Sequence, residues 1–282
     1  MLEKLFDEVK ETLDFDVIEK TINKMSDKKR HAAITEFLLK KGIGIIGGPD
    51  EELTLGEKYF IGMLAGLHNH RVADIQEKIN LEYFGAGCKN INFFVERAGD
   101  YSLFKAKNCL LQAPLNKTGQ FGNFALNFAE KCTSIGNFKE NALSNAKYCK
   151  AQGEFGNGAL TRANSSYGQG NFGQNGFNHG KNLIIVADKI GSFYMPIESI
   201  VIFNSCGQIK SPPYNPRETL IMTTDPEARS KTLTYAGLAP FIPVSLEDVS
   251  KLDIFNNSFN SQIKKFLGDY KQQIPKWLEA RK

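Results

Sequence analysis

The sequence predicts a mainly β protein: a parallel β-solenoid of about 17 residues per coil, with an N-terminal helical cap and C-terminal helices. Three observations favour this fold: a short repeat in the middle of the chain, helical periodicity at both ends, and a composition typical of a folded protein. Hydrophobic residues make up 41% of the 282 residues and charged residues 23%. These proportions exclude wholesale disorder.

The repeat begins at four glycines spaced 17 residues apart, each followed two residues later by phenylalanine. Further positions keep small or apolar residues in the same units, and such fidelity predicts a repeat architecture. The columns are Gly119, Gly136, Gly153 and Gly170; Phe121, Phe138, Phe155 and Phe172; Ala125, Ala142, Ala159 and Gly176; Leu126, Leu143, Leu160 and Phe177; Ala129, Ala146, Ala163 and Gly180; and Cys132, Cys149, Ser166 and Leu183.

The period of the repeat decides between helical and β architectures. Two packed helices and a turn need about 33 residues or more, so 17 residues are too few. One coil of a parallel β-solenoid fits, because at about 3.3 Å per residue it has a perimeter of roughly 56 Å, enough only for its own side chains. We expect the Phe and Leu columns to fill the interior, the Ala columns to line inward bends, and Gly and Asn to form the corners.

Less regular coils flank these four units. Residues 106–109 read like 129–132, and residues 85–88 are interpreted as an earlier copy, which would place Cys88 in the cysteine column. Gly99-Asp100-Tyr101 and Gly191-Ser192-Phe193 echo the Gly-x-aromatic start. The solenoid is therefore predicted over residues 83–224, and its last strands are β-branched stretches at residues 183–186, 197–203 and 220–223.

A rival interpretation is a disordered, low-complexity tract, because residues 153–180 are rich in Gly, Asn, Ser and Gln. Disorder gives no reason for Leu126, Leu143 and Leu160 to keep one register. The solenoid is therefore preferred.

Residues 1–82 are predicted to be a helical cap. Leu2, Leu5, Phe6, Val9 and Leu13 share one helix face, and Thr54-Leu55-Gly56-Glu57 is a capping box before another apolar stripe. The ends of a solenoid expose open strand edges, which a helical cap would cover.

Residues 225–282 are predicted to be helical. Asp225-Pro226-Glu227 is typical of the start of a helix, and residues 245–251 are predicted to form a short helix. An apolar stripe from Phe259 to Trp277 predicts a long amphipathic helix. This helix either caps the solenoid or lies on its side, with its lysines in solvent, or it binds a partner or nucleic acid through its basic residues.

Charge and cysteine content point to a location. The net charge is +4, and the five cysteines are an odd number without a CxxC pair, which favours free thiols over a disulfide framework. No apolar run reaches the roughly 18 residues of a membrane span, and we expect no secretory signal at residues 1–10. A cytoplasmic protein is therefore expected.

Candidate catalytic and metal sites are few. Residues 42–47 match Gly-x-Gly-x-x-Gly, but they follow a predicted helix instead of a strand, so a helix end and loop is favoured over dinucleotide binding. His68, His70 and Asp74 are a weak alternative as Zn or Fe ligands. The column Cys109, Cys132 and Cys149, with Cys88, suits core packing better than a soft metal, because it continues as Ser166 and Leu183.

A groove enzyme acting on sugars would need two converging acids. Asp100 and Glu154 both follow a glycine, so they are assigned to one column, but three coils would separate them by at least about 14 Å. This spacing exceeds the roughly 5–9.5 Å that glycoside hydrolysis requires. No catalytic residue and no cofactor are predicted.

The sequence thus leads to three hypotheses about function. The first is a non-catalytic cytosolic binding or scaffold protein with a protein partner or self-association, which presents a polar exterior. The second is an RNA- or ribonucleoprotein-binding protein that uses the basic later part of the chain, and the third is a sugar- or metal-dependent enzyme. Two columns are predicted to be exterior: Asn123, Glu140, Asn157 and Gln174; and Asn127, Ser144, Thr161 and Asn178. The candidate binding residues are taken from these columns and from the C-terminal helix: Asn123, Asn157 and Gln174; Asn127, Thr161 and Asn178; and Lys264, Lys265, Lys271 and Trp277.

Overall fold

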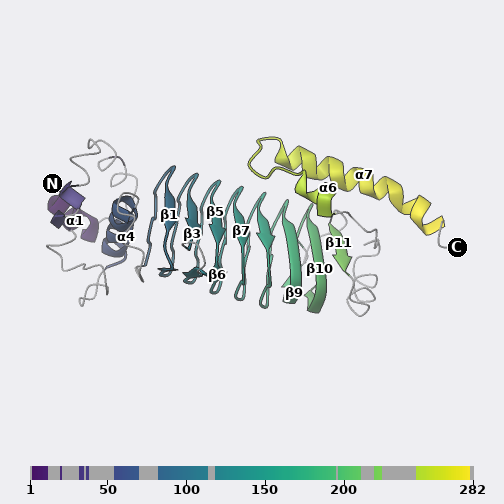
Figure 1. The fold of residues 1–282 in the computed structure, drawn as a ribbon, viewed down its shortest axis with the longest axis horizontal. Helices are drawn as coiled ribbons and strands as arrows, with labels where there is room; N and C mark the ends of the chain where they lie inside the picture. The colour runs from purple at the N-terminus through teal and green to yellow at the C-terminus, as the bar shows by residue number, and fades with distance from the viewer. Residues whose placement is uncertain are drawn as a thin grey trace. The chain divides into compact units, whose positions relative to one another are not determined.

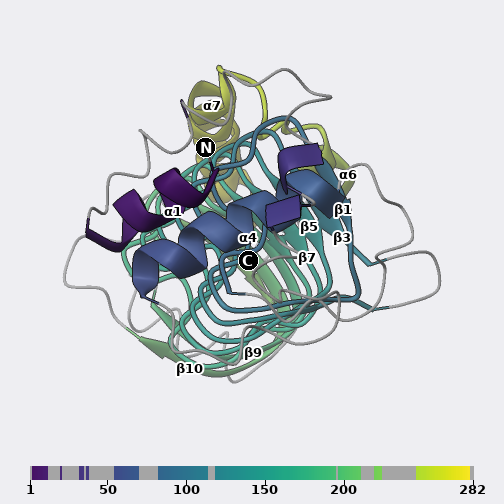
Figure 2. The ribbon, with the colours of Figure 1, turned by 90° about the vertical axis from the view of Figure 1, so that its left-hand side faces the viewer.

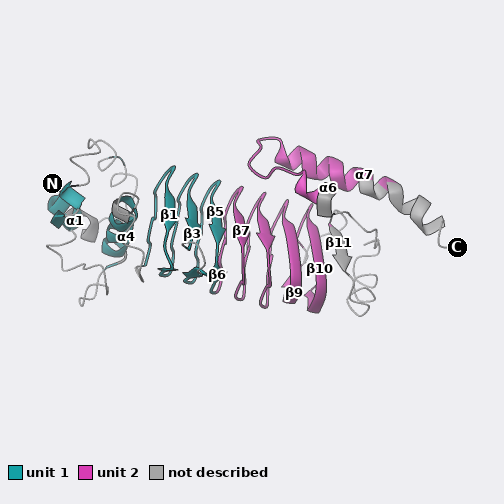
Figure 3. Ribbon diagram, in the orientation of Figure 1, with its two compact units in different colours: residues 1–139 teal, residues 140–282 magenta. Residues whose placement is uncertain are grey.

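The computed structural model confirms the parallel β-solenoid, with about 7 turns and coils of roughly 17 residues (Figure 1). It describes residues 2–11, 20, 32–34, 36–37, 54–69, 82–113, 118–194, 196–210, 219–223 and 246–279. The chain forms two compact units, residues 1–139 (unit 1) and residues 140–282 (unit 2), shown in Figure 3. The predicted boundaries at residues 82 and 224 remain predictions.

Unit 1 combines two described helices with coils built from very short parallel strands. One face of the coils carries β1, β3 and β5, paired in that order, and another carries β2, β4 and β6. The elements are α1 (Leu2–Glu11), α4 (Leu55–Asn69), β1 (Asn92–Phe94), β2 (Arg97–Ala98), β3 (Leu110–Gln112), β4 (Gln120–Phe121), β5 (Thr133–Ile135) and β6 (Asn137–Phe138).

The predicted N-terminal helices are confirmed at α1 and α4, and the capping box at the start of α4 has the expected geometry. The Thr54 N–H donates to Glu57 Oε2 at 2.8 Å, and the Glu57 N–H donates to Thr54 Oγ1 at 3.3 Å. α4 lies across the end of the unit 1 coils (Figure 2), where the Gly85 N–H donates to the Gly62 carbonyl at 2.9 Å. A Cβ on Gly62 would lie 2.4 Å from the Tyr83 carbonyl oxygen, so only glycine allows this contact.

Unit 2 continues with parallel strands that lengthen along the chain. β9 and β10 each have 11 residues and pair over most of their length, starting at Ile184 and Ile200. The elements are β7 (Lys150–Gln152), β8 (Tyr167–Gln169), β9 (Ile184–Tyr194), β10 (Ile200–Lys210), β11 (Leu220–Thr223), α6 (Leu246–Ser250) and α7 (Phe259–Glu279).

The repeat columns fill the interior in both units, as predicted. The Phe, Ala, Leu and Cys positions of the 17-residue period are buried from Phe121 to Leu183. In unit 2 the rings of Phe155 and Phe172 stack at 4.4 Å between centroids, with planes 3° apart. This ladder of like residues is the expected result of stacking parallel coils.

The predicted register of the flanking coils is wrong. Ala98, not Tyr101, pairs with the first repeat phenylalanine, Phe121, so Gly99 does not begin a Gly-x-Phe unit. At the other end Phe172 bridges to Ile190, so Phe193 does not take that column either. The coils contain 18 or 23 residues near the start of the solenoid, and a strict 17-residue period misplaces their residues.

The corners are not made by Gly and Asn alone. In each coil several residues near the corner have left-handed backbone angles, and they include Leu126 (φ 58°), Leu143 (φ 56°) and Arg162 (φ 54°). This conformation costs an L-residue about 1–2 kcal/mol relative to the right-handed one. The burial of the leucine side chains in the bore offsets that cost.

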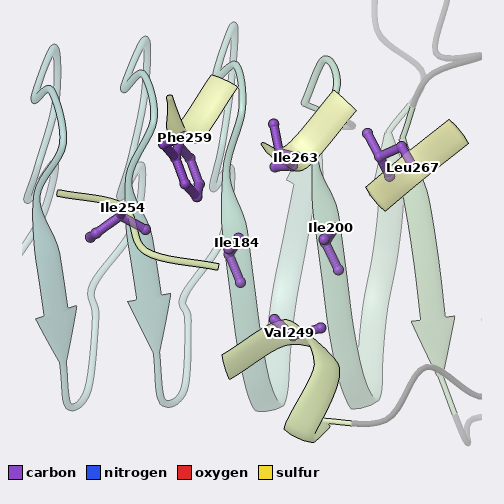
Figure 4. Close-up of a cluster of buried hydrophobic side chains, with 7 residues drawn as sticks. All are labelled: Ile184, Ile200, Val249, Ile254, Phe259, Ile263 and Leu267. Carbon is purple, nitrogen blue, oxygen red and sulfur yellow. The ribbon is translucent and has the colours of Figure 1, made fainter. Parts of the chain in front are cut away.

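The C-terminal helices cover the outer face of β9 and β10 within unit 2 (Figure 4). Phe259, Ile263 and Leu267 lie on one face of α7 and contact a buried cluster. The cluster also contains Ile184, Ile200, Val249 and Ile254. The prediction that this helix lies on the side of the solenoid is confirmed for its first half. The predicted helix start at residue 225 and the glycine-rich residues 42–47 lie outside the described residues.

Candidate functional site

The predicted metal ligands gain no support from the structure. His68 belongs to the last turn of α4, but its side chain is not described, and His70 and Asp74 lie outside the described residues. Among the residues that the structure does describe, no group of three or more His, Cys, Asp or Glu side chains is arranged to hold a metal ion.

The cysteine column differs from the prediction at its first member. Lys89 bridges to Lys107, so Cys88 lies beside Ala106, and Ile91 takes the position before Cys109. The prediction that Cys88 joins the column is therefore wrong. The Cys109 thiol donates to the Lys107 carbonyl at 3.2 Å and to the Cys88 carbonyl at 3.3 Å.

Cys109 and Cys132 are buried thiols that pack inside the coils. The hydrogen bond with the Cys132 thiol, and then burial, raise the pKa of Cys109 far above its usual range. We interpret Cys109 and Cys132 as small core residues.

The two candidate acids lie in different columns, which corrects the sequence assignment. Asp100 is in register with Asn123: its Oδ1 accepts the Asn123 backbone N–H at 2.7 Å, and its Oδ2 accepts the side-chain amide at 3.2 Å. Glu154 accepts the Asn171 amide at 3.0 Å in unit 2. Each carboxylate thus binds the amide of the next coil.

The first predicted exterior column is at the surface, but its side chains bind one another. The Asn157 Nδ2 donates to Glu140 Oε1 at 3.4 Å, and the Asn157 Oδ1 accepts the Gln174 N–H at 2.8 Å. In unit 2 these bonds form a ladder between successive coils, and in unit 1 the Asp100–Asn123 contact likewise joins two coils. The ladder stabilises stacking, and it leaves fewer polar groups to recognise a partner.

The second predicted exterior column is largely turned inward. Asn127 and Ser144 are buried, and Thr161 and Asn178 are half-buried. The Thr161 hydroxyl donates to the Gly158 carbonyl at 2.7 Å, within its own corner. The prediction that this column is exterior is therefore wrong for Asn127 and Ser144, and the Ser144 hydroxyl, like that of Thr161, donates to a carbonyl of its own corner.

One lysine of the predicted basic helix, Lys264, forms an intramolecular ion pair. Lys264 forms an ion pair with the largely buried carboxylate of Glu198 at 3.1 Å, and Lys181 approaches the same carboxylate at 3.5 Å. Lys265 is exposed. The side chains of Lys271 and Trp277 lie outside the described residues.

A feature that the sequence analysis missed is a cluster of rings at one corner of unit 1, here called the aromatic corner: Tyr83, Tyr101, Phe104, Phe124 and Phe128. Tyr83 and Tyr101 stack at 4.9 Å, Tyr101 and Phe124 at 5.0 Å, with planes only 6° and 4° apart. Phe104 meets Tyr101 edge-on at 6.2 Å, and Phe128 at 5.8 Å. Burial raises the pKa of Tyr83 to about 12, with smaller contributions from Tyr101 and Glu82.

The aromatic corner is partly open to solvent. Phe128 is 52% exposed, and Tyr101, Phe104 and Phe124 are half-buried. Lys105 lies over the Phe104 ring, with its Nζ 5.7 Å from the centroid. Exposed aromatic clusters of this kind are uncommon on isolated proteins and common at interfaces.

The same coil positions in unit 2 are polar. One period after Phe124 and Phe128 the chain has Asn141 and Asn145, and two periods after them Gly158 and Arg162. The solenoid therefore forms this corner without aromatic residues. The corner was missed because Tyr83, Tyr101 and Phe124 are separated by 18 and 23 residues, so a 17-residue period does not align them.

Neither a protein-family model, nor a curated protein, nor a solved structure matches this chain. Among the described residues, no helix combines the length and apolar character needed to cross a membrane.

Proposed function

We propose that this chain is a non-catalytic binding protein that holds a protein partner at the aromatic corner of unit 1. The observation that supports this proposal is the exposed ring of Phe128, 52% accessible, beside the half-buried rings of Phe104 and Phe124. Aromatic residues are enriched where binding energy is concentrated in protein interfaces.

The backbone strengthens this argument. Tyr101, Phe124 and Phe128 have φ of 57°, 55° and 57°, a region that Gly and Asn adopt more easily than aromatic residues. Unit 2 uses Asn141 and Gly158 at the Phe124 position, with φ of 56° and 72°. In unit 1, aromatic residues thus occupy left-handed backbone positions at a cost in folding free energy, although the fold does not require aromatic side chains there.

The ring geometry indicates what kind of partner fits. Tyr83, Tyr101 and Phe124 use their faces to stack on one another, so they present mainly their edges outward. A stacked nucleobase needs an open ring face. Ring edges and the Phe128 side chain instead suit apolar side chains of a protein, with Lys105 at the rim.

Site-specific photo-crosslinking tests the proposal. A photoreactive phenylalanine at Phe128 should crosslink one dominant partner in a lysate of the source cells. The same residue at Arg162, the equivalent position two coils later, is the matched control and should not. Phe128→Ser should weaken capture of that partner by about tenfold or more, as expected for a residue that contributes 1–2 kcal/mol or more to binding. Equal crosslinking from both positions would overturn the proposal.

In unit 1, Asn123 lies next to Phe124 in the chain and is a second part of the proposed binding surface. In unit 2, the exposed Asn157 and Gln174 remain candidate binding residues of that unit alone. The five free cysteines are consistent with the cytoplasmic location that we propose. Binding of RNA through the C-terminal helix is less favoured, because Lys264 is already paired with Glu198.

A further inference from the structure

A second surface of unit 1 lies on the outer face of β1, β3 and β5. Phe94 and Ile135 are each 43% exposed and sit on either side of Gln112 in one row. In the adjacent row Leu110 lies between Asn92 and Thr133. Three apolar side chains thus share a small face of parallel strands.

Unit 2 shows what the corresponding strand face binds in this protein. The first and third residues of β9 and β10 are Ile184 and Val186, and Ile200 and Ile202. They pack against α6 and α7 (Figure 4), where Phe259, Ile263 and Leu267 follow one another at intervals of four residues. The first and third strand positions therefore form a seat for an amphipathic helix.

The charge beside this seat differs between the units. In unit 2 Glu198 precedes β10 by two residues, has φ of 48°, and pairs with Lys264 of α7 at 3.1 Å. In unit 1 Lys131 precedes β5 by two residues, with nearly the same φ of 55°. The neighbouring Glu130 is already paired with Lys107 at 2.7 Å. The position next to the seat is thus acidic in unit 2, where Glu198 pairs with a lysine of α7, and basic in unit 1, where it is Lys131.

We propose that the outer face of β1, β3 and β5 docks an amphipathic helix of another protein, with an acidic residue beside its apolar stripe. Phe94, Leu110 and Ile135 receive the apolar residues, and Lys131 pairs with the acid. The α7 helix of a second copy does not fit, because its Lys264 would face Lys131. This surface is separate from the aromatic corner and does not depend on it.

Two matched peptides test this proposal. The basic peptide has the sequence of residues 254–269, and the acidic peptide has the same sequence with Lys264→Glu and Lys265→Glu. Binding to the full chain is measured by fluorescence anisotropy. We expect the acidic peptide to bind the full chain more tightly than the basic peptide does.

Two variants of the full chain locate the binding. Phe94→Ser with Ile135→Ser should weaken binding of the acidic peptide at least about tenfold, because burial of two apolar side chains is lost. Lys131→Glu should reverse the preference between the peptides, by about threefold to fivefold, the range for a surface ion pair. Circular dichroism confirms that each variant is folded.

Each remaining outcome counts against the proposal. Failure of the acidic peptide to bind, equal binding of both peptides, or unchanged binding to the Phe94→Ser and Ile135→Ser chain would overturn it. Tighter binding of the basic peptide would also overturn it, and would indicate that this face binds α7 of a second copy of the chain. None of these results affects crosslinking at Phe128.

Discussion

Gly170 stacks on Gly153 so closely that a Cβ on Gly170 would lie 1.8 Å from the Gly153 carbonyl oxygen. Both glycines also have φ in the range that L-residues rarely adopt, 134° and 140°. Gly170 is therefore required by contact between coils as well as by its backbone conformation.

Gly170→Ala should destabilise unit 2 by about 3 kcal/mol or more, because the carbonyl of the coil below cannot move without breaking its ladder. Thermal and urea unfolding measure the change. Gly268→Ala in α7 is the control, since nothing lies within 4 Å of its Cβ. It should raise stability by up to about 1 kcal/mol, the gain for Gly to Ala in a helix. A tolerated Gly170→Ala would show that the coils do not stack this tightly.

Phe128→Asn separates a binding role for the aromatic corner from a structural one. Asn tolerates φ of 57° better than Phe, which offsets the loss of the part of the Phe128 ring that is buried, so the free energy of unfolding should change by less than about 0.5 kcal/mol. Phe121→Ala is the contrasting variant. Its ring is fully buried in the bore, and its loss should cost about 3–5 kcal/mol. A large loss on Phe128→Asn would mean that the ring serves the fold.

The sequence revealed the core columns because each keeps one residue type at a strict spacing, as Phe138 and Leu143 illustrate. It did not reveal the register of the first coils, because 18- and 23-residue spacings shift Cys88 and Asp100 to other columns. It also did not reveal the left-handed residues. In the sequence, Leu143 cannot be told from a buried leucine with ordinary backbone angles. Its φ of 56° is imposed by the stacking of whole coils and does not follow from the conformational preference of leucine.

The candidate surfaces were predicted less well for a related reason. Asn127 and Ser144 are buried, and the Ser144 hydroxyl donates to the Asn141 carbonyl at 2.8 Å, so residue type alone suggests exposure wrongly. Phe94 and Ile135 alternate with buried residues and could not be assigned to the outer face before the strands β1 and β5 were placed.

Ile263→Ala should detach the first half of α7 from unit 2. Ile263 is fully buried against the β9 and β10 face, and its truncation should cost about 2–5 kcal/mol. Hydrogen exchange should then increase in α6 and α7 before it increases in β9. Lys265→Ala, on the exposed side of the same helix, is the control and should leave exchange unchanged. Uniform loss of protection across unit 2 would contradict a separately docked helix.

Alkaline pH should destabilise unit 1 through the buried Cys109 thiol. Because the pKa of Cys109 is raised in the folded chain, the native state keeps a proton that the unfolded chain loses near pH 8.5. The native state then binds more protons, so the free energy of unfolding is highest below about pH 8.5 and falls as the pH rises above it. Tyr83, with a pKa near 12 when folded, adds a further fall above about pH 10. Cys109→Ser should flatten the slope between about pH 8.5 and 10 in urea titrations, whereas Cys206→Ser, at a half-exposed position, should not. An unchanged slope in Cys109→Ser would show that this thiol ionises as readily in the folded chain as in the unfolded one.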